Sequence, residues 1–585
     1  MTRLLVTIWL AAGSVAMAEI RPEFAMETDP ELHIPPPVRV FSEANRVLWL
    51  QAVSRPEADM QRMAALTIAR AHLVGMPNLS EARPALAKIV SAESTHPAAR
   101  FAAARALIVL DIRDEAVTLF AASQRSGSEL RQEIEPALGR WKFQPMIEAW
   151  HKRLAASDVR HRDLMLAIRG VADADDTASA DAVLTILHDP LRPAAVRLAA
   201  ARSAGRLRDS GLEGHAERLL TFAAASVLDR LEAVALLEHH RSEPARRMLL
   251  RLATDREPSV AAAALATLNS IDHDLVLPLA GEALSNGDAN VRRQGVDAYV
   301  ARPTPERVVA VARLLDDPHQ GLRAVVREEL YRLAQTPELN GPIRQTAVEV
   351  LGGESWRGQE QSALLLAELD HEPAAARLVQ LLESPRPAVT VAAAWGLRKL
   401  AVPDTLPAIL DKATRQTESR LTNRPPPNEL DFQVGHLFEA LGLMRYAPAE
   451  PLLRRYVPKD MSMGELSRGG AIWALGHLHA DSPDEALARQ LVERLTEPDG
   501  MNPSEKMRVR LASAISLGRM GAKSQVDRMR QYMGPVSPYR MSLTLRWAIE
   551  TVTGESIPAP KPPVESITGW FLESIREPPP GDLAP

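Results

Sequence analysis

The sequence contains no cysteine. This excludes disulfide bonds, thiolate catalysis, cysteine-bound zinc, iron–sulfur clusters, c-type haem and a bacterial lipoprotein anchor. Aromatic residues are also scarce, at 4% of the 585 residues. Alanine and leucine fill the apolar positions instead, and these side chains favour closely packed helices. Because the formal net charge is only −5, nothing in the overall charge favours nucleic acid as a partner.

The motifs of the common catalytic sites are absent as well. The sequence has no glycine-rich phosphate loop, no His-Glu-x-x-His and no Gly-x-Ser-x-Gly. His477 and His479 are two residues apart and cannot share one helix face. The acidic run of residues 173–181 lacks the glycine and the closing glutamate of a calcium loop. We therefore predict no catalytic residues, no cofactor and no metal ligands.

What the sequence does contain is one helical pattern that returns about every thirty residues. Each copy fills a frame of twelve residues, as in ARFAAARALIVL and VRLASAISLGRM. Seven copies align without gaps, at residues 99–110, 196–207, 260–271, 322–333, 389–400, 467–478 and 509–520. Weaker copies raise the number to about fourteen, and each interval holds two helices of about twelve residues and two turns. A fixed period of this size is typical of a stacked solenoid.

The proline, alanine and leucine positions of these copies resemble the HEAT repeats, including the phycobilisome-lyase-like HEAT-repeat superfamily. The resemblance covers residues 41–554, nearly the whole chain. It implies an all-α fold, an α-solenoid or superhelix of about fourteen stacked HEAT-like helical hairpins. It does not imply an activity, because the copies share no catalytic signature.

The same superfamily supplies the enzymatic alternative, a metal-dependent hydroxylase or a lyase-type enzyme. The resemblance to deoxyhypusine hydroxylase would imply two irons held by several His-Glu pairs. This sequence has one such pair, His371-Glu372, with a proline behind it in an expected turn. One pair cannot supply the convergent ligands of a two-iron site.

The first eighteen residues read as a signal peptide. Arg3 provides a positive charge, residues 4–16 are apolar, and Ala16-Met17-Ala18 is a small-x-small site with cleavage expected after Ala18. We therefore predict an exported protein, periplasmic or extracellular. No later segment is long and apolar enough for an integral membrane span.

The segments that flank the repeats are rich in proline. Residues 19–40 read as an extended leader that lies against the first repeat or serves as a tether. Residues 555–585 read as a tail with a short helix over residues 564–577, expected to cap the last repeat. One face of that helix would carry the apolar residues Val564, Ile567, Trp570, Phe571 and Ile575.

Helical geometry sorts the positions of the twelve-residue frame onto faces. The second position is often arginine, and in HEAT-like repeats this arginine typically pairs with an acid in the preceding turn. Asp189 before Arg197 and Asp317 before Arg323 fit that pattern. We interpret these arginines as structural.

Positions 7 and 11 of the frame lie four residues apart and share a face, nearly opposite position 2. In HEAT arrays the second helices line the concave side, so this face predicts a groove that is basic in places, with Trp395 and Trp473 as anchors. The alternative is a solvated helix face whose two tryptophans pack against neighbouring repeats. The candidate partner-binding residues are Arg140, Arg206, Arg332, Trp395, Lys399, Trp473, His477 and Arg519.

Taken together, these features favour an exported, non-enzymatic scaffold that binds a protein or polymer partner along a helix-lined groove. The metal-dependent hydroxylase or lyase is the second hypothesis. A cytosolic HEAT protein that acts on nucleic acid is the third, and it would need an uncleaved N-terminus and a groove of net positive charge.

Overall fold

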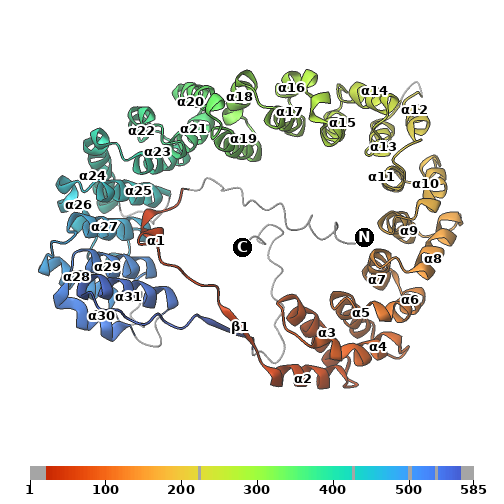
Figure 1. The fold of residues 1–585 in the computed structure, drawn as a ribbon, viewed down its shortest axis with the longest axis horizontal. Helices are drawn as coiled ribbons and strands as arrows, with labels where there is room; N and C mark the ends of the chain where they lie inside the picture. The colour runs from red at the N-terminus through yellow and green to blue at the C-terminus, as the bar shows by residue number, and fades with distance from the viewer. Residues whose placement is uncertain (1–21, 222–224, 424–428, 498–503, 534–537, 568–585) are drawn as a thin grey trace, which may run out of the picture. The chain divides into compact units, whose positions relative to one another are not determined.

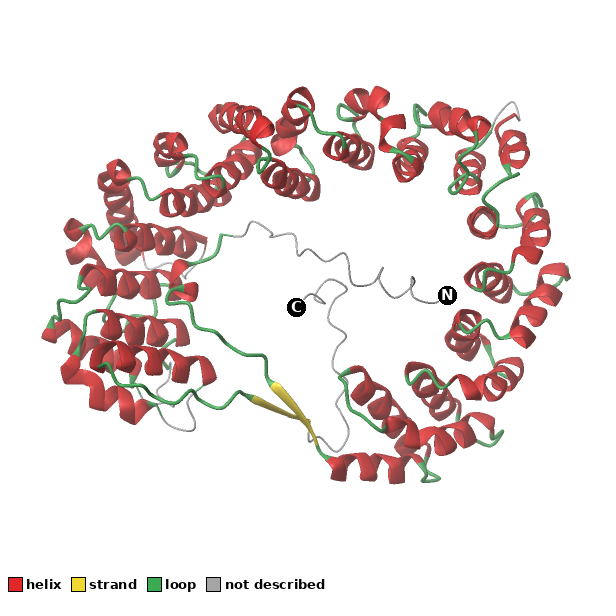
Figure 2. Ribbon diagram, viewed as in Figure 1, coloured by secondary structure: helices red, strands yellow, loops and turns green. Residues whose placement is uncertain are grey.

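The computed structural model describes residues 22–221, 225–423, 429–497, 504–533 and 538–567, so the predicted signal peptide, residues 1–18, lies outside it. The described chain is almost entirely α-helical (Figure 2). Consecutive helices pack in pairs, and each pair packs on the next. The all-α solenoid fold predicted from the repeats is confirmed.

Two compact units divide the chain. Of the described residues, those in the ranges 37–278 and 564–567 form the unit called the N-terminal unit here, and those in the ranges 22–36 and 279–563 form the unit called the C-terminal unit. Within each unit the odd-numbered helices lie on the inner side of the curve and the even-numbered helices lie on the outer side (Figure 1).

In the N-terminal unit the inner helices are α3 (Ala58–Leu73), α5 (Pro97–Val109), α7 (Ser128–Arg140), α9 (His161–Asp173), α11 (Ala194–Leu207), α13 (Val227–Leu236) and α15 (Pro258–Ile271). The outer helices are α2 (Glu43–Val53), α4 (Arg83–Ser91), α6 (Ala116–Arg125), α8 (Gln144–Ala155), α10 (Ala180–Leu187), α12 (Glu213–Thr221) and α14 (Glu243–Leu252). Helix α16 (Leu277–Ala283) contains the division between the units.

In the C-terminal unit the inner helices are α17 (Ala289–Ala301), α19 (Gln320–Leu333), α21 (Trp356–Glu368), α23 (Pro387–Leu400), α25 (Glu429–Leu443), α27 (Glu465–Leu478), α29 (Met507–Arg519) and α31 (Tyr539–Thr553). The outer helices are α18 (Pro305–Ala312), α20 (Pro337–Gly352), α22 (Ala375–Leu381), α24 (Leu406–Asn423), α26 (Glu450–Arg454), α28 (Glu485–Leu495) and α30 (Val526–Tyr532). A one-turn helix, α1 (Ala25–Thr28), precedes the repeats in the chain.

The twelve-residue frames fall on the inner helices. The seven strong copies lie on α5, α11, α15, α19, α23, α27 and α29, and the weaker copies lie on the inner helices α3, α7, α9, α13, α17, α21 and α25. Small residues of the frame let neighbouring inner helices approach closely. A Cβ on Gly442 would lie 2.6 Å from Cα of Ala474, and a Cβ on Gly476 would lie 2.7 Å from Cα of Ser516. Glycine is therefore required where α25, α27 and α29 meet.

The structural role of the second-position arginines is confirmed, but the partners expected for two of them are wrong. Arg197 binds two acids of the next repeat, Asp229 (2.6 Å) and Glu232 (2.7 Å). Arg323 donates to the backbone oxygen of Asp317 (2.8 Å) rather than to its carboxylate. The side chain at this position extends far enough to reach the next repeat or the carbonyl groups of the turn, so an acid in the preceding turn is not needed.

The two strands of the described chain pair in parallel within the N-terminal unit. Strand β1 (Val38–Phe41) lies beside β2 (Val564–Ile567), with Val38 opposite Val564 and Phe41 opposite Ile567 (Figure 2). The helix predicted over residues 564–577 is therefore wrong for its first four residues, and the remainder lies outside the described residues. Prolines before Val564 favour extended backbone, and pairing with β1 satisfies the backbone hydrogen bonds.

For most of the leader, the predicted contact with the first repeat is wrong. The leader's residues 22–36 belong to the C-terminal unit and contact the last repeats, not the first. Residues 38–41, in β1, belong to the N-terminal unit, and Arg39 donates to the carbonyl oxygen of Val74 at the end of α3 (3.4 Å). Within the described ranges, none of the helices combines the length and the apolar character that a membrane crossing requires.

Candidate partner-binding site

The leader residues 22–34, called the leader segment below, lie on the inner helix layer of the C-terminal unit, where α1 packs against α27 (Figure 1). The contacts come from consecutive inner helices. Position 3, 7 or 11 of the twelve-residue frame supplies most of the contacting residues on α25, α27 and α29. These positions are four residues apart and share one helix face.

Two apolar side chains of the leader segment are buried in this face. Phe24 and Met26 are each 5% exposed. The Phe24 ring stacks on His436, with ring centroids 4.0 Å apart and 9° between the planes. A Cβ on Gly435 would lie 2.7 Å from Cε1 of Phe24, and one on Gly469 would lie 3.0 Å from Sδ of Met26. Glycine at position 3 of these two helices thus leaves the space that the leader fills.

The backbone of the leader segment is bound at three atoms. The Met26 N–H donates to Oε1 of Glu439 (2.8 Å). Arg540 donates to the carbonyl oxygen of Glu27 (2.6 Å), and Nε1 of Trp473 donates to the carbonyl oxygen of Asp29 (3.1 Å). Backbone contacts of this kind hold a peptide whatever its side chains are.

The acidic side chains of the leader segment meet two arginines. Arg519 contacts the Asp29 carboxylate at 2.5 Å, and Nε2 of His477 lies 3.2 Å from the same oxygen. The Arg519 guanidinium also lies over the Trp473 ring, 5.1 Å from its centroid. Nε of Arg508 donates to the Glu27 carboxylate (3.0 Å). Charge-assisted contacts of this kind are stronger than neutral hydrogen bonds.

Burial sets the protonation of the groups around Asp29. It lowers the pKa of His477 below the ordinary value, so the ring is neutral at pH 7 and its Nε2–H donates to Asp29. Burial also lowers the pKa of Arg519. For Asp29 itself, burial raises the pKa, but the His477 hydrogen bond and the Arg519 charge outweigh it and hold the pKa below its ordinary value. Asp29 is therefore ionised when the leader is bound.

A buried polar cluster lies beneath Phe24. His436 and Glu439 have no exposed side-chain surface, and Nδ1 of His436 lies 3.5 Å from the Glu439 carboxylate. Arg398 lies 3.6 Å from the same carboxylate. Burial lowers the pKa of His436 and that of Arg398. The Met26 N–H completes this cluster from the leader side.

Three of the candidate residues come together around the leader segment: Trp473, His477 and Arg519. The other five lie elsewhere on the inner layers. Ion pairs join Lys399 to Glu368 (3.3 Å), Arg332 to Glu329 (2.7 Å) and Arg206 to Asp173 (2.8 Å). Arg140 is exposed at the end of α7. Trp395 is 3% exposed, and its Nε1 has no hydrogen-bond partner among the described residues.

Sequence reasoning missed position 3 of the frame and the leader itself. Gly435 and Gly469 are ordinary small residues of an alanine-rich helix until the segment that fills the space beside them is known. The sequence also offered no sign of His436 and Glu439, because no local sequence pattern marks a buried histidine and acid. An aromatic residue, a methionine and two acids within the leader were the available signal, as in FAMETD.

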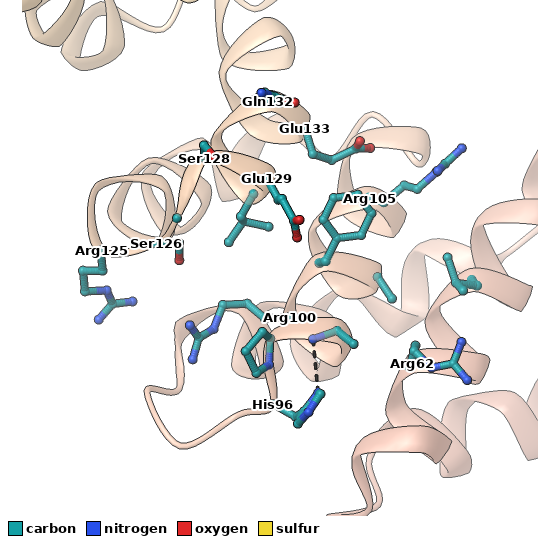
Figure 3. Close-up of a pocket in the computed structure, with 17 residues that line it drawn as sticks. Arg62, His96, Arg100, Arg105, Arg125, Ser126, Ser128, Glu129, Gln132 and Glu133 are labelled. Carbon is teal, nitrogen blue, oxygen red and sulfur yellow. Dashed lines mark hydrogen bonds between the residues drawn. The ribbon is translucent and has the colours of Figure 1, made fainter. Parts of the chain in front are cut away.

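The inner layer of the N-terminal unit has a different site, a cavity of about 1190 Å³ between α3, α5 and α7 (Figure 3). Arg105 and Glu133 are among the residues that line this cavity. Arg100 also lines the cavity, and its guanidinium donates to the carbonyl oxygens of Ala92 (2.9 Å) and Glu93 (3.0 Å). No residue of the described leader lines this cavity.

One group of side chains in the described part of the chain has the spacing of a metal site: Glu450, His479 and Asp484. Arg454 already bridges the two acids, at 2.7 Å from Glu450 and 2.6 Å from Asp484. A guanidinium thus provides the positive charge here. His371, of the single His-Glu pair, lies in a turn before a short 3-10 helix, as expected.

No family model and no curated protein matches the chain. Solved structures resemble its fold. A structure of Kap95p with RanGDP is 13% identical, with a TM-score of 0.49, over 87% of this chain and 72% of that chain. A structure of importin-β is 11% identical, with a TM-score of 0.46, over 87% and 82%. Yeast importin-β (Kap95p) is 12% identical, with a TM-score of 0.42, over 87% and 72%. The likeness concerns the fold alone.

Proposed function

We propose that the protein is an exported, non-enzymatic scaffold that binds a protein partner by holding a short segment of it on the inner helix layer of the C-terminal unit. The observation that carries the proposal is the bound leader segment. It is held by backbone hydrogen bonds, two buried side chains and ion pairs. A surface that holds one segment of polypeptide in this way has the chemistry to hold another.

The non-enzymatic part rests on the sequence, which lacks the catalytic motifs and offers one His-Glu pair. The exported part rests on the signal-peptide pattern of residues 1–18. Cleavage after Ala18 would place the leader segment close to the mature N-terminus. N-terminal sequencing of the protein from its host should then begin at Glu19, and a chain that still begins at Met1 would contradict export.

Peptide binding can be tested on the full chain with its own leader weakened. The variant carries Phe24→Ala, Met26→Ala and Asp29→Ala, and is called the triple leader variant below. The probe is a fluorescein-labelled peptide of residues 22–34. Fluorescence anisotropy should show saturable binding.

Adding Arg519→Ala to the triple leader variant should weaken peptide binding by about tenfold to a hundredfold, because a hydrogen bond to a charged group contributes about 1.5–3 kcal/mol. Arg332→Ala is the matched control, since Arg332 is half exposed on the same layer and pairs within α19. Absence of binding, or equal binding with and without Arg519, would reject the site.

A further inference from the structure

The leader segment and a partner segment would use the same atoms of the C-terminal unit, so both cannot be bound at once. From the contacts of the leader we infer the chemistry of the partner. It is a protein whose binding segment has an aromatic residue, a large apolar residue two positions later, an acid at the next position and a second acid two positions after that. Such a segment displaces the leader. This inference rests on the proposed function of the site.

The aromatic position follows from the pocket around Phe24. The ring is parallel to His436 at 4.0 Å and lies against Gly435. A second ring, that of Phe432, lies 6.0 Å away. A flat side chain fills this space and gains the offset contact between rings, whereas an aliphatic side chain of similar volume would lose it.

The apolar position follows from Met26, which is buried beside Gly469. Its N–H is the donor to Glu439, a carboxylate with no exposed surface. Proline is therefore excluded here, because it has no N–H and would leave this buried acceptor unsatisfied.

The two acidic positions follow from Glu27 and Asp29. They face Arg508 and Arg519, and both arginines are partly buried. The helical turn of α1 sets the spacing, since the Asp29 N–H donates to the carbonyl oxygen of Ala25 (2.9 Å). A partner segment must therefore form one helical turn to bring its two acids to the two arginines.

The leader has an advantage over a partner, because it belongs to the same chain. A tethered segment acts at an effective concentration of about millimolar. A free peptide of the leader's own sequence should therefore bind the natural chain at least about tenfold more weakly than it binds the triple leader variant.

The test measures, by fluorescence anisotropy, how tightly the labelled peptide of residues 22–34 binds to three proteins that each span residues 19–585. These are the natural chain, the triple leader variant, and a control with His33→Ala, which alters an exposed leader residue. We expect clear binding to the triple leader variant and at least about tenfold weaker binding to the natural chain and to the control. If the peptide binds equally to all three proteins, the leader does not compete with a partner segment, and the proposed function remains. No binding to any of them would refute the proposed function itself.

The pattern is tested with peptide variants on the triple leader variant. Replacing Phe24 by Leu should weaken binding by about twofold to tenfold, and Met26 by Pro or Asp29 by Asn by about tenfold or more, while His33→Ala should not. If the Leu, Pro and Asn peptides bind as well as the natural one, the inferred partner chemistry is wrong.

A second measurement uses the natural chain alone, in case the triple leader variant does not fold. Hydrogen exchange should find the Met26 amide protected in the free protein, because it is bonded to Glu439. Excess peptide should make that amide exchange fast. The added peptide carries norleucine in place of methionine, so that mass spectrometry can distinguish it from the leader of the protein. Protection that persists at saturating peptide would show that the leader is a fixed part of the fold.

Discussion

The inner helix layers of the two units are built on the same frame but carry different surfaces. In the C-terminal unit, positions 3 and 7 hold Gly435 and Glu439 on α25, and Gly469 and Trp473 on α27, and the leader covers them. In the N-terminal unit the corresponding residues of α5 are Phe101 and Arg105, beside a cavity that no described leader residue fills. The frame therefore determines which positions face inward, and the residues that occupy positions 3 and 7 determine what can bind there.

The largest effect should come from making the C-terminal layer resemble the N-terminal one at position 3. Gly435→Val would place a side chain in the space of the Phe24 ring, where even a Cβ would lie 2.7 Å away. Such overpacking costs about 1–3 kcal/mol, so peptide binding to the triple leader variant should fall by about fivefold to a hundredfold. Anisotropy measures the loss. Unchanged affinity would mean that the Phe24 pocket does not bind the peptide.

Acid should weaken peptide binding at the C-terminal layer, because burial lowers the pKa values of His436 and His477 when the site is covered. Uncovering either histidine removes part of this burial and raises its pKa toward the ordinary value, so the free site takes up a proton that must be lost on binding. Affinity is thus complete above about pH 6.5 and lost as the pH falls, by up to about tenfold per histidine at pH 5.5. Asp29 stays ionised throughout this range.

The pH effect is measured by anisotropy at pH 7.5 and 5.5. A His477→Gln variant keeps a hydrogen-bond donor and cannot titrate, so its pH dependence should be smaller. Tighter binding at pH 5.5 would show that attraction between a protonated His477 and Asp29 outweighs the cost of burying that charge.

A smaller effect is expected for Trp473→Phe. Phenylalanine keeps one six-membered aromatic ring but removes the pyrrole part of the indole, including the Nε1–H that donates to the carbonyl oxygen of Asp29. A single neutral hydrogen bond contributes about 1 kcal/mol, so affinity should fall by about fivefold. Titration of the peptide against this variant provides the measurement. A loss of a hundredfold would indicate that the indole supports Arg519 through its ring, not only through its hydrogen.

The smallest effect is expected in the N-terminal layer. Arg105→Ala removes a charge from position 7 of α5 in the open cavity. Peptide affinity should change by less than about twofold, since surface substitutions away from a site have small effects. A clear loss of peptide binding would show that the two layers do not act separately.

The sequence could predict the solenoid because each repeat needs only its neighbours. The alanines, leucines and prolines of one repeat specify two helices and the face that each helix buries. The sequence could predict the inward face for the same reason, and this prediction identified Trp473, His477 and Arg519. The sequence could not predict what these three residues bind. Lys399 and Arg332 occupy position 11 of the frame, as His477 and Arg519 do, yet each of them pairs with an acid of its own unit and does not contact the leader segment.

The tail shows where local patterns were insufficient. Residues 564–577 have apolar residues at helical spacing, but Val564–Ile567 form a strand because β1 offers a parallel partner. Helical spacing in a short segment has little weight when another strand can satisfy its backbone.

The amino-acid sequence by itself determined the period of the repeat, the helices and which of their residues share a side, because helical geometry depends only on neighbours along the chain. Only the tertiary structure decided that the leader, with Met26 separated by 413 residues from Glu439, fills the inner layer of the C-terminal unit. Contacts over such separations depend on how stacked repeats bring three helices together, and no local pattern in the chain records that arrangement.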